Sequence, residues 1–291
     1  MTDRHAQRST LRRSIAERRA LVAPGVFDMI SARIADDMGF DALYMTGYGI
    51  SASYLGLPDA GLATYSDMVS CVQRMAERCR TPLIADADTG YGGLLNMRHT
   101  VQGYEAAGAA AIQVEDQVFP KRCGHTLGRA VIPAEQMVAK IGVALDSRRD
   151  PDFMIIARTD ARTARGLEEA LARGVAYRDA GADVVFVESL ESEAEMAEAV
   201  QRLDCPMLAN MVERGLSPLL AQSRLAELGF ALAIFPTSGF LAAAAALRAT
   251  YGALREDGTT ASVLDRLEDF GSFSRAIGFQ DVWDFEKRYG N

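Results

Sequence analysis

The chain has 291 residues, of which 49% are hydrophobic and 24% are charged, a composition typical of a globular protein with one large or two small domains. Its net charge of −8 argues against nucleic-acid or anionic-membrane partners, so any anion has to be bound by a few local cations or a metal. The four cysteines form no CxxC pair and no apolar run approaches the roughly 20 residues that span a membrane, so we expect a cytoplasmic protein.

The first 19 residues are rich in Arg and Ser, as a transit peptide is. Two acids, Asp3 and Glu17, interrupt them, and they lead directly into the first apolar run. We predict a surface helix over 1–19, with a targeting segment as the alternative.

One unit then recurs, in which a short aliphatic or β-branched run is followed by a polar turn and an amphipathic stretch. The strand-like runs are 21–25, 42–47, 82–88, 110–116, 153–160, 183–189, 206–211 and 232–238. Amphipathic helices are predicted between them, for example over 66–79, 166–181 and 194–203.

Eight apolar strands with a helix after each are the pattern of a closed parallel (β/α)₈ TIM barrel. A doubly wound open sheet is the alternative, but it usually has a Gly-rich phosphate loop after its first strand. Here the first strand continues as APGVFD (23–28), without such a loop. We predict one barrel domain over 1–291.

The last segment, 256–291, is polar at first and then rich in aromatic residues, including the only Trp, Trp283. Aromatic side chains in such number need a surface to pack on. We predict a helical tail that docks on the barrel or on a neighbouring subunit.

Nearly every predicted strand ends in a polar or ionisable residue. These ends carry Thr46, Gly47, Tyr48, Gly49, Asp86, Asp88, Glu115, Asp116, Arg158, Thr159, Asp160, Glu188, Asn210, Thr237 and Ser238. Contact with water explains any one of them, but the carboxyl ends of barrel strands share one rim, where barrel enzymes bind their ligands. The whole set therefore indicates a ligand site.

Asp86 and Asp88 are two residues apart, so both side chains lie on the same face of the strand. With Glu115 they form a cluster of like charges that is costly unless a cation neutralises it. Oxygen ligands favour Mg²⁺, with Mn²⁺ as the alternative, and Asp59 is a further candidate acid, although Pro-Asp in a loop is more often a turn. Zinc is disfavoured because Cys123 and His125 lack partners at familiar spacings.

Cys123 lies in PKRCGH (120–125), among Lys121, Arg122 and His125. Cationic neighbours lower the pKa of a thiol and make it reactive. His125 is too near in sequence for a simple nucleophile–base pair, so we interpret Cys123 as a general acid or base in a reaction that creates a carbanion next to a carboxylate.

Two features of the predicted rim suit a carboxylate ligand. The TGYG stretch (46–49) offers unhindered backbone N–H groups, and Arg158 offers a bidentate guanidinium. Arg158 paired to a neighbouring acid is the alternative that the sequence leaves open.

These motifs also carry a family resemblance. PKRCGH, together with 45–59, DADTGYG (86–92) and IIARTDA (155–161), resembles the isocitrate lyase/phosphoenolpyruvate mutase superfamily from about residue 20 to the C-terminus. KRCGH is typical of its lyase-type members, in which the Cys protonates the departing enolate. The chain is most similar to the 2-methylisocitrate lyases and to the 2,3-dimethylmalate lyase/petal death protein group. TGYG replaces the Ser-Gly-Gly stretch of the former, which favours the latter.

The resemblance implies a site in detail. Asp86 would hold Mg²⁺, while Asp59, Asp88 and Glu115 would act through its waters. Arg158 and the backbone of 46–48 would bind the carboxylate of the 2-oxo acid part. The remaining pocket would be lined by Lys121, Arg122, Gly124, His125, Glu188, Asn210 and Ser238.

The activity implied is cleavage of a 2-methylisocitrate- or 2,3-dimethylmalate-like acid to pyruvate and a second carboxylic acid, with Cys123, Arg158, Lys121 and His125 as the catalytic set. A carboxyphosphonoenolpyruvate mutase, which shares KRCGH, and an oxaloacetate hydrolase are the competing enzymes. A catalytically idle barrel is the alternative of another class. The resemblance also implies a homotetramer of helix-swapped dimers.

Overall fold

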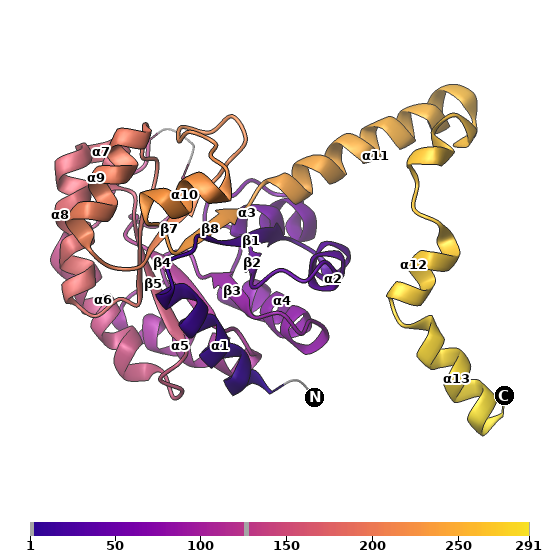
Figure 1. Cartoon of the computed structure of the whole chain (residues 1–291), viewed down its shortest axis with the longest axis horizontal. Coiled ribbons are helices and arrows are strands. Elements are labelled where there is room, and N and C mark those ends of the chain that lie inside the picture. Colours follow the sequence, from indigo (N-terminus) through magenta and orange to yellow (C-terminus); the bar gives the residue numbers. More distant parts are fainter. Residues whose placement is uncertain (1–2, 125–127, 291) are drawn as a thin grey trace. The chain divides into compact units, whose positions relative to one another are not determined.

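The computed structural model describes residues 3–124 and 128–290, and the chain divides into two compact units, Met1–Gly239 and Phe240–Asn291. The first unit is a closed barrel of eight parallel strands, which are hydrogen-bonded in chain order with β8 beside β1 (Figure 1). The strands are β1 (Leu21–Val26), β2 (Leu43–Met45), β3 (Leu83–Asp86), β4 (Ala111–Glu115), β5 (Met154–Thr159), β6 (Val184–Val187), β7 (Met207–Asn210) and β8 (Leu232–Phe235). The predicted TIM barrel is confirmed.

Helices surround the barrel and connect its strands. They are α2 (Met29–Asp37), α3 (Gly47–Ile50), η1 (Ser51–Leu55), α4 (Tyr65–Arg78), α5 (Leu94–Ala107), α6 (Ala134–Ser147), α7 (Ala161–Arg165), α8 (Leu167–Asp179), α9 (Glu193–Leu203) and α10 (Gln222–Leu228). Local signals set several ends. Thr64 and Asp67 form a capping box at the start of α4, and Gly108, with φ +106°, ends α5.

The inside of the barrel is apolar from its amino-terminal end to its middle. Inward-facing residues on successive strands pack there, among them Leu21, Tyr44, Ile84, Met154, Phe186, Leu208 and Ile234. The N-terminal helix α1 (Arg4–Ala16) adds Leu11 and Ile15 to the same cluster. The predicted helix at the N-terminus is therefore present, but one of its faces is buried in the core instead of lying on the surface.

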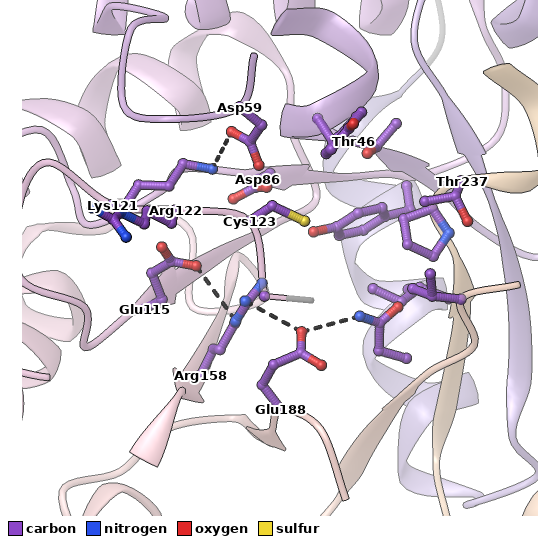
Figure 2. Close-up of a pocket in the computed structure, with 17 residues that line it drawn as sticks. Thr46, Asp59, Asp86, Glu115, Lys121, Arg122, Cys123, Arg158, Glu188 and Thr237 are labelled. Atoms are coloured by element: carbon purple, nitrogen blue, oxygen red, sulfur yellow. Dashed lines mark hydrogen bonds and ion pairs between the residues drawn. The ribbon is translucent and has the colours of Figure 1, made fainter. Parts of the chain in front are cut away.

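Side chains alternate along each strand, so the inward position two residues further on lies at the carboxyl rim. Tyr44 is followed in this way by Thr46, Ile84 by Asp86, and Ile156 by Arg158. A pocket opens at this rim (Figure 2). The same period of two that fills the barrel therefore also places the polar groups in the pocket.

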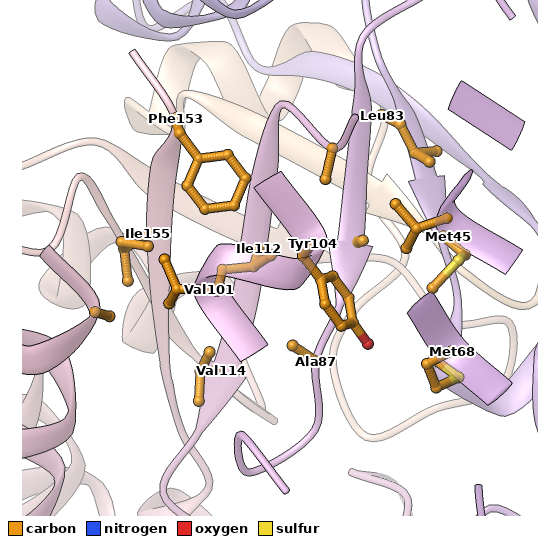
Figure 3. Close-up of a cluster of buried hydrophobic side chains, with 14 of the residues drawn as sticks. Met45, Met68, Leu83, Ala87, Val101, Tyr104, Ile112, Val114, Phe153 and Ile155 are labelled. Carbon is orange, nitrogen blue, oxygen red and sulfur yellow. The ribbon is translucent and has the colours of Figure 1, made fainter. Parts of the chain in front are cut away.

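A second apolar layer lies between the strands and the outer helices. Met68 of α4, together with Val101 and Tyr104 of α5, packs against outward residues of the strands such as Leu83, Ile112 and Ile155 (Figure 3). These side chains are almost completely buried. The layer fixes β3, β4 and β5, which carry the acids and the arginine of the pocket.

The second unit is helical. It contains most of α11 (Ser238–Asp257), a short 3₁₀ helix η2 (Ala261–Arg266), α12 (Phe270–Ala276) and α13 (Phe279–Tyr289). Within α13 the rings of Phe279 and Trp283 are 6.0 Å apart, and those of Phe285 and Tyr289 are 4.7 Å apart. The predicted helical tail is present, and its docking stays a prediction. Among the described helices of both units, none is long and apolar enough to cross a membrane.

Candidate active site

The pocket at the carboxyl rim is lined by residues from seven of the eight strands or the loops that follow them, and most are polar. They are Tyr44, Thr46, Tyr48, Asp59, Asp86, Glu115, Lys121, Arg122, Cys123, Gly124, Arg158, Glu188, Asn210, Val212, Ile234, Pro236 and Thr237. In Figure 2 the guanidinium of Arg158 lies between Glu115 and Glu188, and the Lys121 amine points toward Asp59. Twelve of the predicted site residues thus share one cavity.

Asp86 is the buried acid at the end of β3. Its Oδ1 accepts a hydrogen bond from the Asp88 N–H at 3.0 Å, and its Oδ2 accepts one from the Gly47 N–H at 3.3 Å. A Cβ on Gly47 would lie 2.6 Å from that Oδ2, so glycine is needed for the close approach. The Gly47 N–H that the sequence suggested for a substrate carboxylate therefore donates to Asp86, and TGYG forms the start of α3, capped by Thr46.

Lys121 neutralises part of the acidic cluster. Its Nζ lies 2.5 Å from an Asp59 oxygen and 2.7 Å from an Asp88 oxygen, and all three side chains are buried. Burial alone would lower the pKa of Lys121, but the charges of Asp88, Asp59 and further acids outweigh it and hold the pKa well above its usual value. Burial raises the pKa of Asp88 to about 6 against the opposing effect of Lys121. The lysine is therefore a permanent cation inside the site.

Arg158 lies at the centre of a second group of buried charges. Its Nε is 3.4 Å from Glu115 Oε2, and its Nη2 is 3.2 Å from Glu188 Oε2, which also accepts from Asn210 Nδ2 at 3.0 Å. Asp160 accepts two hydrogen bonds from the guanidinium, both at 2.9 Å. The ion pair that the sequence left open is thus present, and Arg158 still lines the pocket.

Cys123 is half-buried and lines the pocket, and its N–H donates to the Asp59 carbonyl at 3.2 Å. The main chain just before it is held by Gln117, whose side-chain amide accepts from Arg122 N at 2.9 Å and donates to Arg122 O at 2.8 Å. The segment that carries the thiol is therefore fixed on the amino-terminal side of Cys123, by Gln117.

A few predicted site residues are placed differently. Gly47 and Asp88 do not line the pocket but hold Asp86 and Lys121, which do. Ser238 donates a hydrogen bond to Glu213 and is not in the lining. His125 lies outside the described residues.

Several participants in the site, or their partners, were not predicted from the sequence. Tyr44 lines the pocket two residues before Thr46, and its hydroxyl donates to Gln113 Oε1 at 3.1 Å inside the barrel. Asp160 was among the polar residues at the strand ends, but its pairing with Arg158 was not predicted, although it stands two residues later on the same face. Gln117 had no such signal, because its role depends on how the chain after β4 folds back.

The acids of the pocket fit a hard divalent cation that keeps most of its waters. Glu115 Oε1 is buried and has no hydrogen-bond partner among the described residues, and burial raises the pKa of Glu115 well above its usual range. Asp59, Asp86, Asp88 and Glu115 do not bring three ligand atoms within 4.8 Å of one another. At most two of these acids can therefore contact one ion directly, and the others would act through its waters.

One described group does meet that spacing, namely His5, Asp150 and Asp152. It lies at the amino-terminal side of the barrel, where the loop before β5 meets α1. Arg8 and Arg12 already form ion pairs with its two acids. It therefore has no part in the pocket at the carboxyl rim.

The chain is a (β/α)₈-barrel protein with a polar pocket at the carboxyl ends of its strands. In barrels of this class the active site lies at that rim. Comparison with known proteins gives the family. The family model described as phosphoenolpyruvate phosphomutase matches residues 11–255, and the chain belongs to the phosphoenolpyruvate mutase/isocitrate lyase superfamily.

Two relatives are similar over nearly the whole chain. A 2,3-dimethylmalate lyase of Eubacterium barkeri is 47% identical over 96% of both chains. A 2-methylisocitrate lyase of Aeropyrum pernix is 43% identical over 96% of this chain and 88% of its own. The superfamily is catalytic and these relatives are named lyases, so the chain is an enzyme.

Solved structures agree. An oxaloacetate acetylhydrolase in complex with the inhibitor 3,3-difluorooxalacetate has a TM-score of 0.92 at 38% identity, over 99% of this chain and 98% of the other. A phosphonopyruvate hydrolase in complex with oxalate and Mg²⁺ has a TM-score of 0.88 at 30% identity, over 100% of both chains. The predicted resemblance is confirmed at the level of the superfamily, whose members differ in the bond they break.

Proposed function

We propose that the protein is a Mg²⁺-dependent carbon–carbon lyase that cleaves a 2,3-dimethylmalate- or 2-methylisocitrate-like 2-hydroxy acid. Its products are a 2-oxo acid, pyruvate, and a second carboxylic acid. The observation that carries the proposal is the presence of the Cys123 thiol in the same pocket as Arg158 and the buried acids. A proton donor, a carboxylate-binding cation and a metal-type acid cluster are what this cleavage requires.

Asp86 would hold the metal, with Asp59, Asp88 and Glu115 acting through its waters, and when bound the metal would supply Lewis-acid polarisation of the substrate's hydroxyl and carboxylate oxygens. Lys121 limits the repulsion among these acids, because it is paired to Asp59 and Asp88. Arg158 provides the fixed positive charge for a substrate carboxylate, and its neighbours Glu188 and Asn210 hold it in place.

Cleavage breaks one carbon–carbon bond and moves two protons. The hydroxyl proton leaves for a basic group in the pocket, and the bond between the carbinol carbon and its substituted neighbour breaks. The carbinol carbon becomes the carbonyl of the 2-oxo acid, while the electron pair moves to the neighbour as an enolate. Cys123 donates its proton to that carbon, which completes the second carboxylic acid.

Hydrolysis of oxaloacetate is the second candidate, because of the likeness to the oxaloacetate acetylhydrolase structure. Both reactions break a carbon–carbon bond next to a carboxylate, and the same Arg158 and acids serve either. The lyase is preferred because the 2,3-dimethylmalate lyase relative is 47% identical over 96% of the chain.

The test supplies the purified protein and Mg²⁺ with 2,3-dimethylmalate, 2-methylisocitrate and oxaloacetate in parallel. Pyruvate is followed through lactate dehydrogenase and NADH, and oxalate is measured separately. We expect EDTA-sensitive pyruvate release from one of the first two. Oxalate from oxaloacetate without pyruvate from either acid would replace the lyase by the hydrolase.

The role of Cys123 is tested by Cys123→Ser, which should lower kcat about 10²- to 10⁴-fold, the usual contribution of a general acid. Cys71→Ser is the matched control, since Cys71 is also half-buried but lies on α4 outside the pocket. It should leave kcat unchanged. Equal turnover by the Cys123→Ser variant would contradict the proton-donor role.

A further inference from the structure

Asp160 links two arginines that belong to different parts of the site. It is fully buried just after β5, and its Oδ1 and Oδ2 each accept from the Arg158 guanidinium at 2.9 Å. The same Oδ1 also accepts from Arg129 Nη1 at 2.7 Å. Arg129 is anchored once more through Nη2, which donates to Thr163 Oγ1 at 2.6 Å. One carboxylate thus fixes both guanidinium groups.

Arg129 stands where the chain that carries Cys123 returns to the barrel. The next residue, Ala130, accepts from Val118 N at 2.8 Å, and Val131 forms an antiparallel bridge with Gln117. These contacts close the base of the excursion that begins after β4. The Arg129–Asp160 pair therefore ties that base to β5, whereas Gln117 holds the outgoing side next to Cys123.

The link joins three buried charged groups. Arg158 and Arg129 are both almost completely buried, and Asp160 is the acid that they share. Bidentate charge-assisted hydrogen bonds fix the plane of a guanidinium as well as its position. Without the Asp160 charge, Arg158 would keep Glu115 and Glu188, but the buried Arg129 would lose the acid that pairs with it in the described structure.

We propose that Asp160 and Arg129 are positioning residues. The buried Asp160 carboxylate sets the orientation of the substrate-binding Arg158, and through Arg129 it also fixes the position of the segment that carries Cys123. Arg158, which binds the carboxylate, and Cys123, which delivers the proton, are thereby held at a fixed position relative to each other. The inference rests on the proposed function for its kinetic readout, but not for its structural one.

The experiment compares Asp160→Asn, Arg129→Met and Arg129→Lys in the full chain. The matched control is Arg162→Met, because Arg162 also makes a two-point pair, with Glu195 at 2.9 and 2.7 Å, but does not contact Arg158 in the described structure. Four quantities are measured: kcat, KM, the thermal midpoint, and the rate of Cys123 alkylation by iodoacetamide. A Cys71→Ser background leaves Cys79 and Cys205 buried, so alkylation reports on Cys123.

Misplacement of a reacting group by about 1 Å costs about 10²-fold in rate, which sets the scale. Asp160→Asn should raise KM and lower kcat, each by about tenfold or more, because it releases both arginines. Arg129→Met should lower kcat by about tenfold and change the Cys123 alkylation rate severalfold, with little change in KM. Arg129→Lys should recover most of the loss, and Arg162→Met should match the wild type.

The proposal is overturned if Arg129→Met and Asp160→Asn keep kcat, KM and alkylation within twofold of the wild type, even if both melt earlier, since a merely structural role predicts that result. If Asp160→Asn does not fold, the two Arg129 variants decide alone. If the wild type releases no pyruvate, the proposed function fails, and the alkylation rates still support or overturn the positioning role.

Discussion

Gly124 lets the main chain pass directly over the Arg158–Glu188 pair. A Cβ at this position would lie 2.3 Å from Arg158 Nη2 and 2.6 Å from Glu188 Oε2, distances at which something has to move. Its carbonyl accepts from Ser189 Oγ at 3.1 Å, which fixes the approach. The missing side chain is thus a requirement of the site and not of the local backbone.

We expect Gly124→Ala to reduce kcat/KM by about 10²-fold, because the added methyl displaces either Cys123 or Arg158 by about an ångström. Steady-state kinetics with the substrate that releases pyruvate checks this. Gly142→Ala on α6 is the control, since no atom lies within 4 Å of the added methyl and alanine favours a helix. Unchanged kinetics for Gly124→Ala would mean that the segment adjusts freely.

At the level of residues, the sequence predicted which side chains line the pocket better than it predicted their hydrogen-bond partners. Asp86, Glu115, Arg158 and Asn210 were all readable as inward positions at strand ends, because the period of two leaves few alternatives. The hydrogen bond from the Gly47 N–H to Asp86 could not be predicted, since it depends on how β2 and β3 are staggered. The shared use of Asp160 likewise depends on where the chain returns after Cys123.

At the scale of elements, α1 closes the amino-terminal end of the barrel. Leu11 and Ile15 enter the core, and Arg8 donates to the carbonyls of Glu105 and Ala109 at 2.7 and 3.0 Å. His5 Nδ1 lies 3.0 Å from Asp150 Oδ2 at the first turn. The helix is therefore held by an apolar face in the middle and by charges along its edge.

The His5–Asp150 pair predicts a pH-dependent stability. The hydrogen bond and charge of Asp150 raise the pKa of His5, so its contribution is full below about pH 6.5 and is lost as the pH rises through the raised value. Burial alone would raise the pKa of Asp150, but its hydrogen bonds, from His5 first, outweigh it and lower the pKa, so that contribution is lost only in acid, below about pH 4.

His5→Gln should therefore lower the thermal midpoint at pH 5.5, and the difference from the wild type should close by pH 8.5. Scanning calorimetry at the two pH values measures it. In an Asp150→Asn background the same substitution should have no effect at either pH, because the partner is absent. A difference that persists at pH 8.5 would assign the effect of His5 to packing.

Element positions were predicted well where the pattern was long. The run 110–116 contains β4 (Ala111–Glu115), and 153–160 contains β5 (Met154–Thr159). The run 42–47 was less accurate, because Thr46 leaves β2 to cap α3. The hydrogen bond that the Gly49 N–H donates to Thr46 Oγ1 at 3.4 Å starts the helix there, and the sequence did not reveal it.

At the scale of the whole molecule, the C-terminal unit buries little of its own surface. No residue of α11 or α13 is buried, although α13 carries Phe279, Trp283 and Phe285. Exposed aromatic helices of this kind are typical of surfaces that pack against another chain. The predicted homotetramer gives them a partner.

Light scattering on the eluted protein should give about four times the 31.5 kDa mass of the chain. The pair of substitutions Trp283→Glu and Phe285→Glu should produce smaller species, because a charge on an apolar contact is costly to bury. Lys287→Glu, a change of charge on the same helix, should leave the mass unchanged. A wild-type protein that elutes as a monomer would rule out the tetramer.

The pocket also has a consequence for how the gene can be divided. Asp86, Glu115 and Cys123 precede α6, whereas Arg158, Glu188 and Asn210 follow it, so neither contiguous half of the chain contains a working set. The two halves meet along β8–β1 and along β4–β5, where Glu115 is the register partner of Arg158. Two polypeptides cut between these strands would each be inert, and turnover would appear only when they reassemble, which makes the barrel a natural scaffold for a split reporter.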